Sequence, residues 1–171
     1  DDLESAIVAT LPPGGYTAIE SGKSNGTGWG LVEVYDLDQS SGSQLANIST
    51  RAVVGTGNNV IIGGFILGGT ENPAKIIIRA IGPSLALAGV VNPLADPTLE
   101  LRDANGVLMG LDDNWKDDPA QAAQIIAAEI PPQNDFEAAI VVTLSPGVYT
   151  AIVAGKNNRT GVGLVEVYNL Q

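Results

Sequence analysis

One 36-residue sequence occurs twice in this chain. Residues 2–37 and residues 135–170 align without a gap at an offset of 133, and 25 of the 36 aligned positions are identical. Identity of this extent at a fixed offset indicates a true internal repeat. Because the chain has 171 residues, it contains one complete period of 133 residues and a further 38 residues of a second period.

The repeat predicts where the domains begin and end. Residues 39–44 are rich in Ser, Gly and Gln, a composition typical of a flexible linker. We therefore expect residues 45–171 to form one complete domain, and residues 1–38 to be the C-terminal strands of a preceding repeat or strands donated to another molecule. A folded unit that takes strands from both copies is a further possibility. The first residue, Asp1, is consistent with a processed protein or a piece of a longer one.

The hydrophobic pattern of residues 45–171 is mostly that of strands, because β-branched runs alternate with turns rich in Gly, Pro and Asn. Only residues 120–129 have a helical pattern, with Pro119 before them and Pro131 after them. Strands are expected at residues 45–54, 59–67, 75–81, 98–102, 107–111, 138–144, 148–154 and 163–168. This pattern predicts an all-β fold, an antiparallel β-sandwich of the jelly-roll or immunoglobulin-like kind with one short helix.

The first copy of the repeat raises a question of stability. Three strands are expected in it, at residues 4–11, 15–21 and 30–35, and alone they would expose an apolar face and open edges. Either the chain is one window of a longer tandem array, or the segment packs into a neighbouring molecule in place of residues 135–170. Both arrangements give a head-to-tail contact, and such a contact forms an open filament when it does not close.

The composition excludes several classes of function. The chain contains neither Cys nor His, which removes disulfides, thiol nucleophiles, Cys-type zinc sites and the Ser-His-Asp triad. Its formal net charge of −11 argues against binding to nucleic acid, which requires clustered Lys and Arg. No apolar run approaches the length of about 20 residues that spans a bilayer, so no membrane insertion is expected.

The densest acidic stretch predicts a cation site. Residues 96–118 contain seven Asp and Glu against two Lys and Arg. Carboxylates and an Asn amide in one loop suit Ca²⁺, which takes about six to eight oxygen ligands. The candidate calcium ligands are Asp96, Asp112, Asp113, Asn114, Asp117 and Asp118. The spacing is not that of an EF-hand loop, and the alternative is a solvated acidic loop in which Asp117 or Asp118 caps the helix.

Other motifs have both a functional and a structural interpretation. Asn-x-Ser/Thr sequences begin at Asn25, Asn47 and Asn158. They would be glycosylation acceptors in a source that glycosylates, although Asn is also typical of turns. Glu33 and Glu166 are equivalent across the repeat, but a Glu between two Val is typical of the outer face of a strand, and we expect no catalysis. Trp29 and Trp115 are candidates to stack on a carbohydrate.

Three stretches resemble a known family. Residues 96–106 (DPTLELRDANG), 111–115 (LDDNW) and 144–150 (LSPGVYT) are similar to the pre-peptidase C-terminal β-sandwich domains of secreted bacterial proteins. The whole period, with residues 79–85 (RAIGPSL) and 163–170 (GLVEVYNL), resembles the long tandem-repeat surface and secreted proteins of environmental bacteria. The resemblance implies an extracellular, non-catalytic module that is often associated with calcium.

These observations predict a structural module of an extracellular tandem-repeat protein that assembles head to tail into a fibre or surface structure, stabilised by calcium. Its partners would be copies of itself or adjacent repeats. The alternative is a non-catalytic accessory module of a secreted protein, which binds carbohydrate or adheres to a surface. A buried Trp115 and strands that cross between repeats would favour the structural role, and a groove with exposed Trp and Tyr would favour binding.

Overall fold

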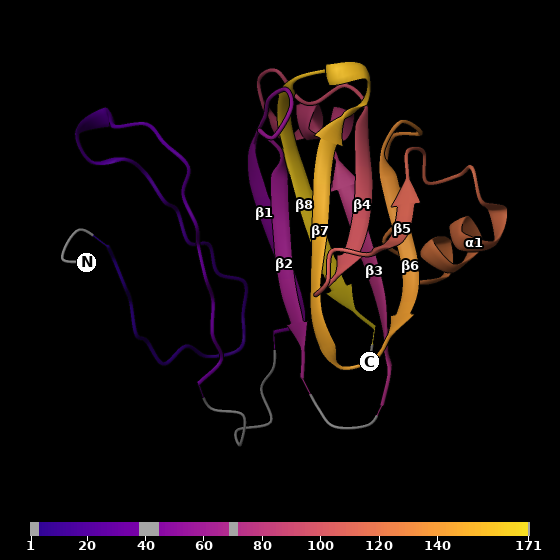
Figure 1. Ribbon diagram of the computed structural model, residues 1–171, viewed down its shortest axis with the longest axis horizontal. Coiled ribbons are helices and arrows are strands. Elements are labelled where there is room, and N and C mark those ends of the chain that lie inside the picture. Colours follow the sequence, from indigo (N-terminus) through magenta and orange to yellow (C-terminus); the bar gives the residue numbers. More distant parts are fainter. Residues whose placement is uncertain (1–3, 38–44, 69–71, 171) are drawn as a thin grey trace. The chain divides into compact units, whose positions relative to one another are not determined.

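The computed structural model describes residues 4–37, 45–68 and 72–170. The chain divides into two units, Asp1–Leu45 and Ala46–Gln171 (Figure 1). We call residues 4–37 the N-terminal segment and residues 46–170 the sandwich. The linker expected at residues 39–44 lies outside the described residues.

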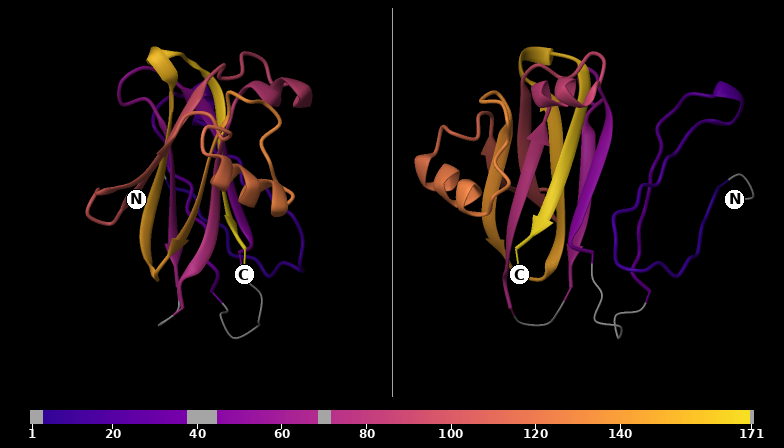
Figure 2. Two further views of the ribbon diagram at one scale, coloured as in Figure 1. Left: turned by 90° about the vertical axis from the view of Figure 1, so that its right-hand side faces the viewer. Right: turned by 180° about the vertical axis from the view of Figure 1, so that it is seen from behind.

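The sandwich consists of two four-stranded sheets with antiparallel strand pairing throughout (Figure 2), which confirms the expected fold class. The first sheet has the order β1 (Asn47–Val54), β8 (Gly161–Asn169), β3 (Ala74–Ile81) and β6 (Ala138–Leu144). The second has the order β2 (Ile61–Leu67), β7 (Gly147–Gly155), β4 (Pro97–Asp103) and β5 (Leu108–Asp112). Since β1 pairs with β8, β2 with β7, β3 with β6 and β4 with β5, the topology is that of a jelly roll.

This strand order has a consequence for the last three strands, because β6, β7 and β8 do not pair with one another. Strand β6 bonds to β3, strand β7 bonds to β2 and β4, and strand β8 bonds to β1 and β3. Each of them therefore depends on a strand from the earlier part of the domain. We call β1–β5 the framework and β6–β8 the C-terminal complement.

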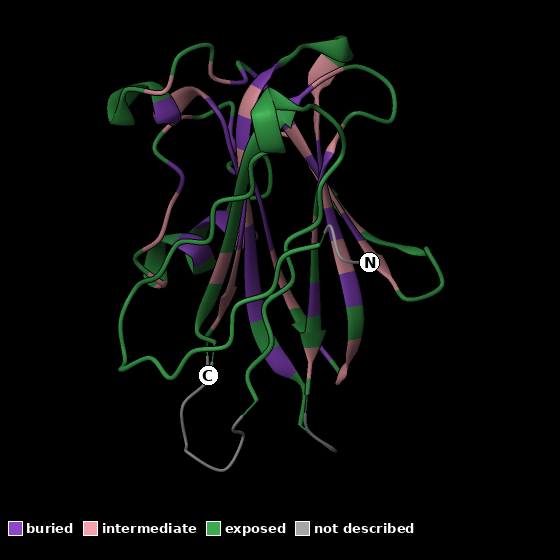
Figure 3. Cartoon of the chain, turned by 90° about the vertical axis from the view of Figure 1, so that its left-hand side faces the viewer, coloured by how far each residue is buried: buried purple, intermediate pink, exposed green. Residues whose placement is uncertain are grey.

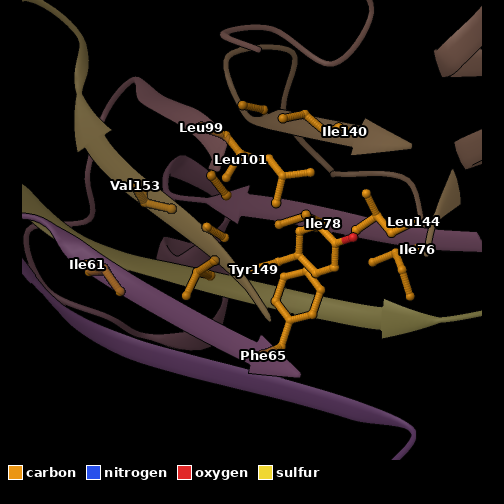
Figure 4. Packing of buried hydrophobic residues seen from close by; sticks show 14 of the residues in the cluster. Ile61, Phe65, Ile76, Ile78, Leu99, Leu101, Ile140, Leu144, Tyr149 and Val153 are labelled. Carbon is orange, nitrogen blue, oxygen red and sulfur yellow. The ribbon is translucent and has the colours of Figure 1, made fainter. Parts of the chain in front are cut away.

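The core lies between the two sheets and is filled by the inward residues of every strand except β5 (Figure 4). Its labelled members come from both sheets: Ile61, Phe65, Ile76, Ile78, Leu99, Leu101, Ile140, Leu144, Tyr149 and Val153. The rings of Phe65 and Tyr149 stack with their centroids 5.6 Å apart. Burial of these side chains is the main stabilising contribution to the fold.

A second apolar cluster lies on the outer face of the first sheet, under helix α1 (Pro119–Ala127). Its buried members are Ile77, Trp115, Ala122, Ile125 and Ala139. Strand β3 is therefore covered on both faces, and Ile76, Ile77 and Ile78 are all fully buried. This explains why β3 has a continuous apolar run where most strands alternate.

The eight strands and the helix of the sandwich lie within two residues of their expected bounds. Helix α1 stops before residue 129 because Ala128 is its C-cap and Glu129 adopts a left-handed conformation at φ 60°. The short 3-10 helix η2 (Pro83–Ala88) was not expected from the sequence.

The N-terminal segment differs from expectation. Strands were expected at residues 4–11, 15–21 and 30–35, but the described segment contains only the 3-10 turn η1 (Lys23–Asn25) and every residue in it is exposed (Figure 3). The strand prediction is wrong here for a topological reason. These residues are the equivalents of β6–β8, which do not pair with one another, so the segment lacks the strands to which it would bond.

Candidate functional site

The acidic loops gather around one lysine. Lys156, just after β7, forms an ion pair through Nζ with Asp113 Oδ2, and its backbone N–H donates to the carbonyl oxygen of Asp96 at 2.9 Å. The pKa of Lys156 is raised, mainly by the hydrogen bond to Asp113 and further by the charges of Asp96 and Asp117. The fold therefore brings carboxylates from before β4 and after β5 to a single ammonium group.

Three oxygen atoms of these loops are buried without a hydrogen-bond partner among the residues that the structure describes: Asp96 Oδ1, Asp113 Oδ1 and Asn114 Oδ1. Asp96 is only 7% exposed, and Arg159 Nη1 lies 3.9 Å from its other carboxylate oxygen, which is beyond hydrogen-bonding distance. Buried oxygens without donors are rare and costly in proteins. Oxygens of this kind are the ligands that Ca²⁺ prefers.

The amide of Asn114 is oriented by its neighbour, since Nδ2 donates to Asp117 Oδ2 at 3.2 Å. Asp112 and Asp118 have other partners. Asp112 Oδ2 accepts from the backbone N–H of Ala139 in β6 at 2.8 Å, and burial raises the pKa of Asp112.

Asp118 is the N-cap of α1, and its Oδ1 accepts from the backbone N–H groups of Ala120 and Gln121. The capping interpretation is confirmed for Asp118. Of the six candidate calcium ligands, the structure therefore places Asp96, Asp113 and Asp117 near Lys156 and joins Asn114 to Asp117. The other two, Asp112 and Asp118, have structural partners.

Within residues 4–37, 45–68 and 72–170, no group of three or more Asp, Glu, Cys or His side chains is placed to hold a metal ion. The described loops instead contain two carboxylates, of Asp96 and Asp113, and one amide, of Asn114, that each have a buried oxygen without a hydrogen-bond partner. The Lys156 ammonium is the present counter-charge of Asp113. A divalent cation at this position would compete with Lys156 for Asp113.

The second notable feature is the N-terminal segment, which shares two local turn features with the C-terminal complement. Ser24 has φ 54° and ψ 38°, and so does its equivalent Asn157. Tyr16 Oη donates to the carbonyl oxygen of Pro12 at 2.6 Å, and its equivalent Tyr149 donates to Ser145 at 2.9 Å. Local sequence therefore sets the turns of this segment, although its strands are not formed.

Two of the three candidate glycosylation residues belong to the same turns. Asn25 and Asn158 are equivalent and have φ of 61° and 59°, a left-handed conformation that Asn tolerates better than most residues. Asn47 is the first residue of β1, where its Nδ2 donates to the carbonyl oxygen of Val167 at 3.4 Å. These positions account for Asn without a glycan, and glycosylation stays a prediction.

One buried carboxylate joins the complement to the framework. Glu137 is fully buried, and its Oε1 accepts from Gly82 N at 3.1 Å, Ser84 N at 2.9 Å and Ser84 Oγ at 2.5 Å. Its Oε2 accepts from the backbone N–H of Asn134 at 3.1 Å. Local sequence patterns do not single out Glu137, although its recurrence as Glu4 in the other copy is a signal.

A second polar anchor lies on the outer face of the first sheet. Arg79 Nε donates to Glu166 Oε2 at 2.9 Å, Nη1 donates to the carbonyl oxygen of Ile130 at 2.7 Å, and Nη2 donates to Tyr168 Oη at 2.9 Å. Tyr168 Oη in turn donates to Glu166 Oε1 at 3.0 Å. Glu166 thus holds β8 against β3 and is covered, whereas the Glu-Val alternation predicted an exposed strand face.

The N-terminal segment carries half of this anchor. Tyr35 Oη donates to Glu33 Oε1 at 3.0 Å, as in the equivalent pair of Tyr168 and Glu166. The arginine of the complete network comes from β3, which has no counterpart in the first copy.

The two tryptophans differ in exposure. Trp115 is 5% exposed and its Nε1 donates to the carbonyl oxygen of Asn134 at 3.2 Å, so its ring is packed under α1 and is not a platform for a sugar. Trp29 is 92% exposed. No helix in the described part of the chain has the length and hydropathy to cross a bilayer.

No protein-family model matches this sequence, and a search of curated proteins gives no match either. One similar solved structure is the pre-peptidase C-terminal domain of a collagenase from Bacillus anthracis. It is 13% identical, with a TM-score of 0.43 over 71% of this chain and 88% of that chain. A likeness at this distance assigns no function.

Proposed function

We propose that this chain is a structural module of an extracellular tandem-repeat protein whose modules join head to tail into a fibre or surface structure. The observation that carries the proposal is the N-terminal segment. It repeats the sequence and turns of β6–β8, yet it has neither a strand nor a buried residue. Strands that can pair with it are equivalents of β1–β4, so they belong to another module or molecule. Such a contact is heterologous and extends into a filament when it does not close.

We further propose that Ca²⁺ stabilises the module through Asp96, Asp113 and Asn114, with Asp117 beside them. The unpartnered buried oxygens support this proposal. At a net charge of −11, a bound cation would also reduce the repulsion among carboxylates. Binding to the folded state alone would raise the stability of that state.

Electron microscopy of the native material, alone and after treatment with EGTA, tests both parts. Filaments that loosen in EGTA are the expected result. Filaments that EGTA leaves unchanged would keep the structural role and remove calcium from it. Single particles without end-to-end contact would contradict assembly and favour the alternative, a non-catalytic binding module in which the exposed Trp29 contacts a carbohydrate or surface.

The calcium proposal has a sharper test in the purified chain. Lys156→Gln removes the cation that competes for Asp113, so we expect tighter Ca²⁺ binding by calorimetry, and Asp96→Asn should weaken binding at least about tenfold. Lys116→Gln is the matched control, because Lys116 pairs with Asp135 instead. Absence of Ca²⁺ binding, or binding unchanged by Asp96→Asn, would show that these oxygens hold no calcium.

A further inference from the structure

At one position of the repeat, a residue that is apolar and buried in the core in one copy is replaced by an acidic residue in the other. Val153 in β7 is fully buried, opposite Ile61 of β2 on one side and Leu99 of β4 on the other (Figure 4). The equivalent residue of the N-terminal segment is Glu20. The other fully buried difference, Ser5 for Ala138, adds only a hydroxyl group.

The side chain of Glu20 lies on the side of the segment that corresponds to the core. A Cβ atom added at Gly30 would collide with the carboxylate of Glu20. Gly30 is the equivalent of Gly163, where an added Cβ would meet Ile61, Val54 and Leu94. In a sandwich the Glu20 carboxylate would therefore point among the side chains of the apolar core.

A framework with the sequence of this chain's β1–β5 does not suit this carboxylate. The residues paired with Val153 are Ile61 and Leu99, and neither carries a polar side-chain atom. The side chains that face Gly163, the equivalent of Gly30, are those of Ile61, Val54 and Leu94, and these are apolar as well. An ionised carboxylate buried without a partner is strongly unfavourable. A valine side chain therefore fits this position of the framework, whereas a glutamate side chain does not.

The other anchors of the segment do fit a framework of this type. Glu33 and Tyr35 are already hydrogen-bonded to each other as Glu166 and Tyr168 are, and they lack only the arginine that Arg79 supplies. Glu4 corresponds to Glu137, which binds the turn at Gly82 and Ser84. The segment is therefore a complement for a related framework that differs where it meets residue 20.

Building on the proposed head-to-tail function, we propose that the N-terminal segment completes a β1–β5-type framework that bears an arginine at the Arg79 position, a Gly-x-Ser turn at the Gly82 position, and a basic or hydrogen-bond-donating side chain facing Glu20. Glu20 is thus the residue that determines specificity. It directs the segment to a non-identical repeat and keeps it out of the framework of this chain or of its copies. A polar mismatch of this kind is a common means of excluding a wrong partner.

The test compares the full chain with its Glu20→Val variant after unfolding and refolding at high concentration. Hydrogen exchange of residues 14–36 reports insertion, because inserted residues gain sheet hydrogen bonds, and light scattering reports whether insertion is between chains. We expect unprotected amides in the wild type and amides that exchange at least about tenfold more slowly in a population of the variant. Ser21→Val, which adds the same side chain at the adjacent position, is the matched control and should behave as the wild type.

A reciprocal variant makes the result independent of competition from β6–β8. In Glu20→Val/Val153→Glu, the carboxylate moves to the C-terminal complement, so protection should move from residues 147–155 to residues 14–22. Unprotected residues 14–22 in this double variant would overturn the proposal.

Protection of residues 14–36 in the wild type, with oligomers, would also overturn it, since the segment would then enter its own framework despite Glu20. That outcome would leave head-to-tail assembly intact. Native material without end-to-end contact in the microscope would contradict the proposed function itself, whatever the variants show.

Discussion

The N-terminal segment and the C-terminal complement are two copies of one sequence in two different states. They share the 3-10 turn with its left-handed residues and the tyrosine that bonds back across four residues. One copy contributes three strands and part of the core, and the other has no strand and no buried residue. The strands of this repeat therefore form only where partner strands supply hydrogen bonds, whereas its turns form from their own residues.

The largest effect is expected from giving the C-terminal copy the carboxylate of the N-terminal copy. Val153→Glu should lower the free energy of unfolding by at least about 3 kcal/mol, because it buries an unpaired charge between Ile61 and Leu99. Urea denaturation monitored by circular dichroism measures this. Val148→Glu, in the same strand but 49% exposed, is the control and should cost less than about 1 kcal/mol. Equal effects at the two sites would show that residue 153 is not in a closed core.

The next largest loss of stability is expected from Glu137, the buried carboxylate just before β6. Glu137→Ala removes the acceptor of the Gly82 and Ser84 N–H groups, and we expect a loss of about 2–4 kcal/mol, because buried donors are left without partners. The equivalent change in the other copy, Glu4→Ala, should leave the urea midpoint of the sandwich unchanged. If the urea midpoint fell equally in both variants, Glu4 and Glu137 would both be part of a folded sandwich, which would contradict the difference between the two copies.

A smaller effect is expected at the outer anchor. Tyr168→Phe removes the hydrogen bonds of Tyr168 with Arg79 and Glu166, at a cost of about 1–2 kcal/mol. Tyr35→Phe removes the corresponding bond to Glu33, and the stability of the sandwich should not respond to it. Thermal unfolding of the two variants side by side gives the comparison, and a response to Tyr35→Phe would place that residue inside a folded sandwich.

The smallest effect concerns pH. Burial raises the pKa of Asp112 above its ordinary value of 3.8, so its protonated form is favoured in the folded state. The stability of the wild type relative to Asp112→Asn should therefore be highest below about pH 4 and should decline as the pH rises through the folded-state pKa.

The decline should stay below about 1 kcal/mol, because Asp112 is only half-buried and solvent screens it. Melting temperatures of both proteins in EGTA across this range provide the measurement. A difference that grows with rising pH would contradict a raised pKa. The experiment also tests the hydrogen bond between Asp112 and β6, since Asp112 accepts from the backbone N–H of Ala139.

Much of the sandwich was predictable from the sequence, and so was one part of the acidic site. Strand and helix positions follow from periodicity and from Pro and Gly, and Asp118 caps α1 as its position before Pro119 suggested. The grouping of Asp96 with Asp113 around Lys156 was not predictable in full, because loops before β4, after β5 and after β7 meet only once the strands are paired.

The anchors at Glu137 and Glu166 were missed for the same reason. Glu137 bonds to Ser84, 53 residues earlier, and Arg79 bonds to Glu166, 87 residues later. A pattern within a window of a few residues carries no information on such pairs, and both carboxylates looked like ordinary polar positions. The choice of jelly-roll over immunoglobulin-like topology likewise depends on strand order, which local patterns leave open.

The period of the repeat, the turns and the short helix can be read from the amino-acid sequence, because they depend on residues close together in the chain. Whether a copy of the repeat forms strands depends instead on the strands with which it can pair. Strands β6–β8 take their hydrogen bonds and buried contacts from β1–β4, and backbone groups that lack such partners stay with water. One sequence can therefore be part of a core at residues 137–170 and exposed throughout residues 4–37.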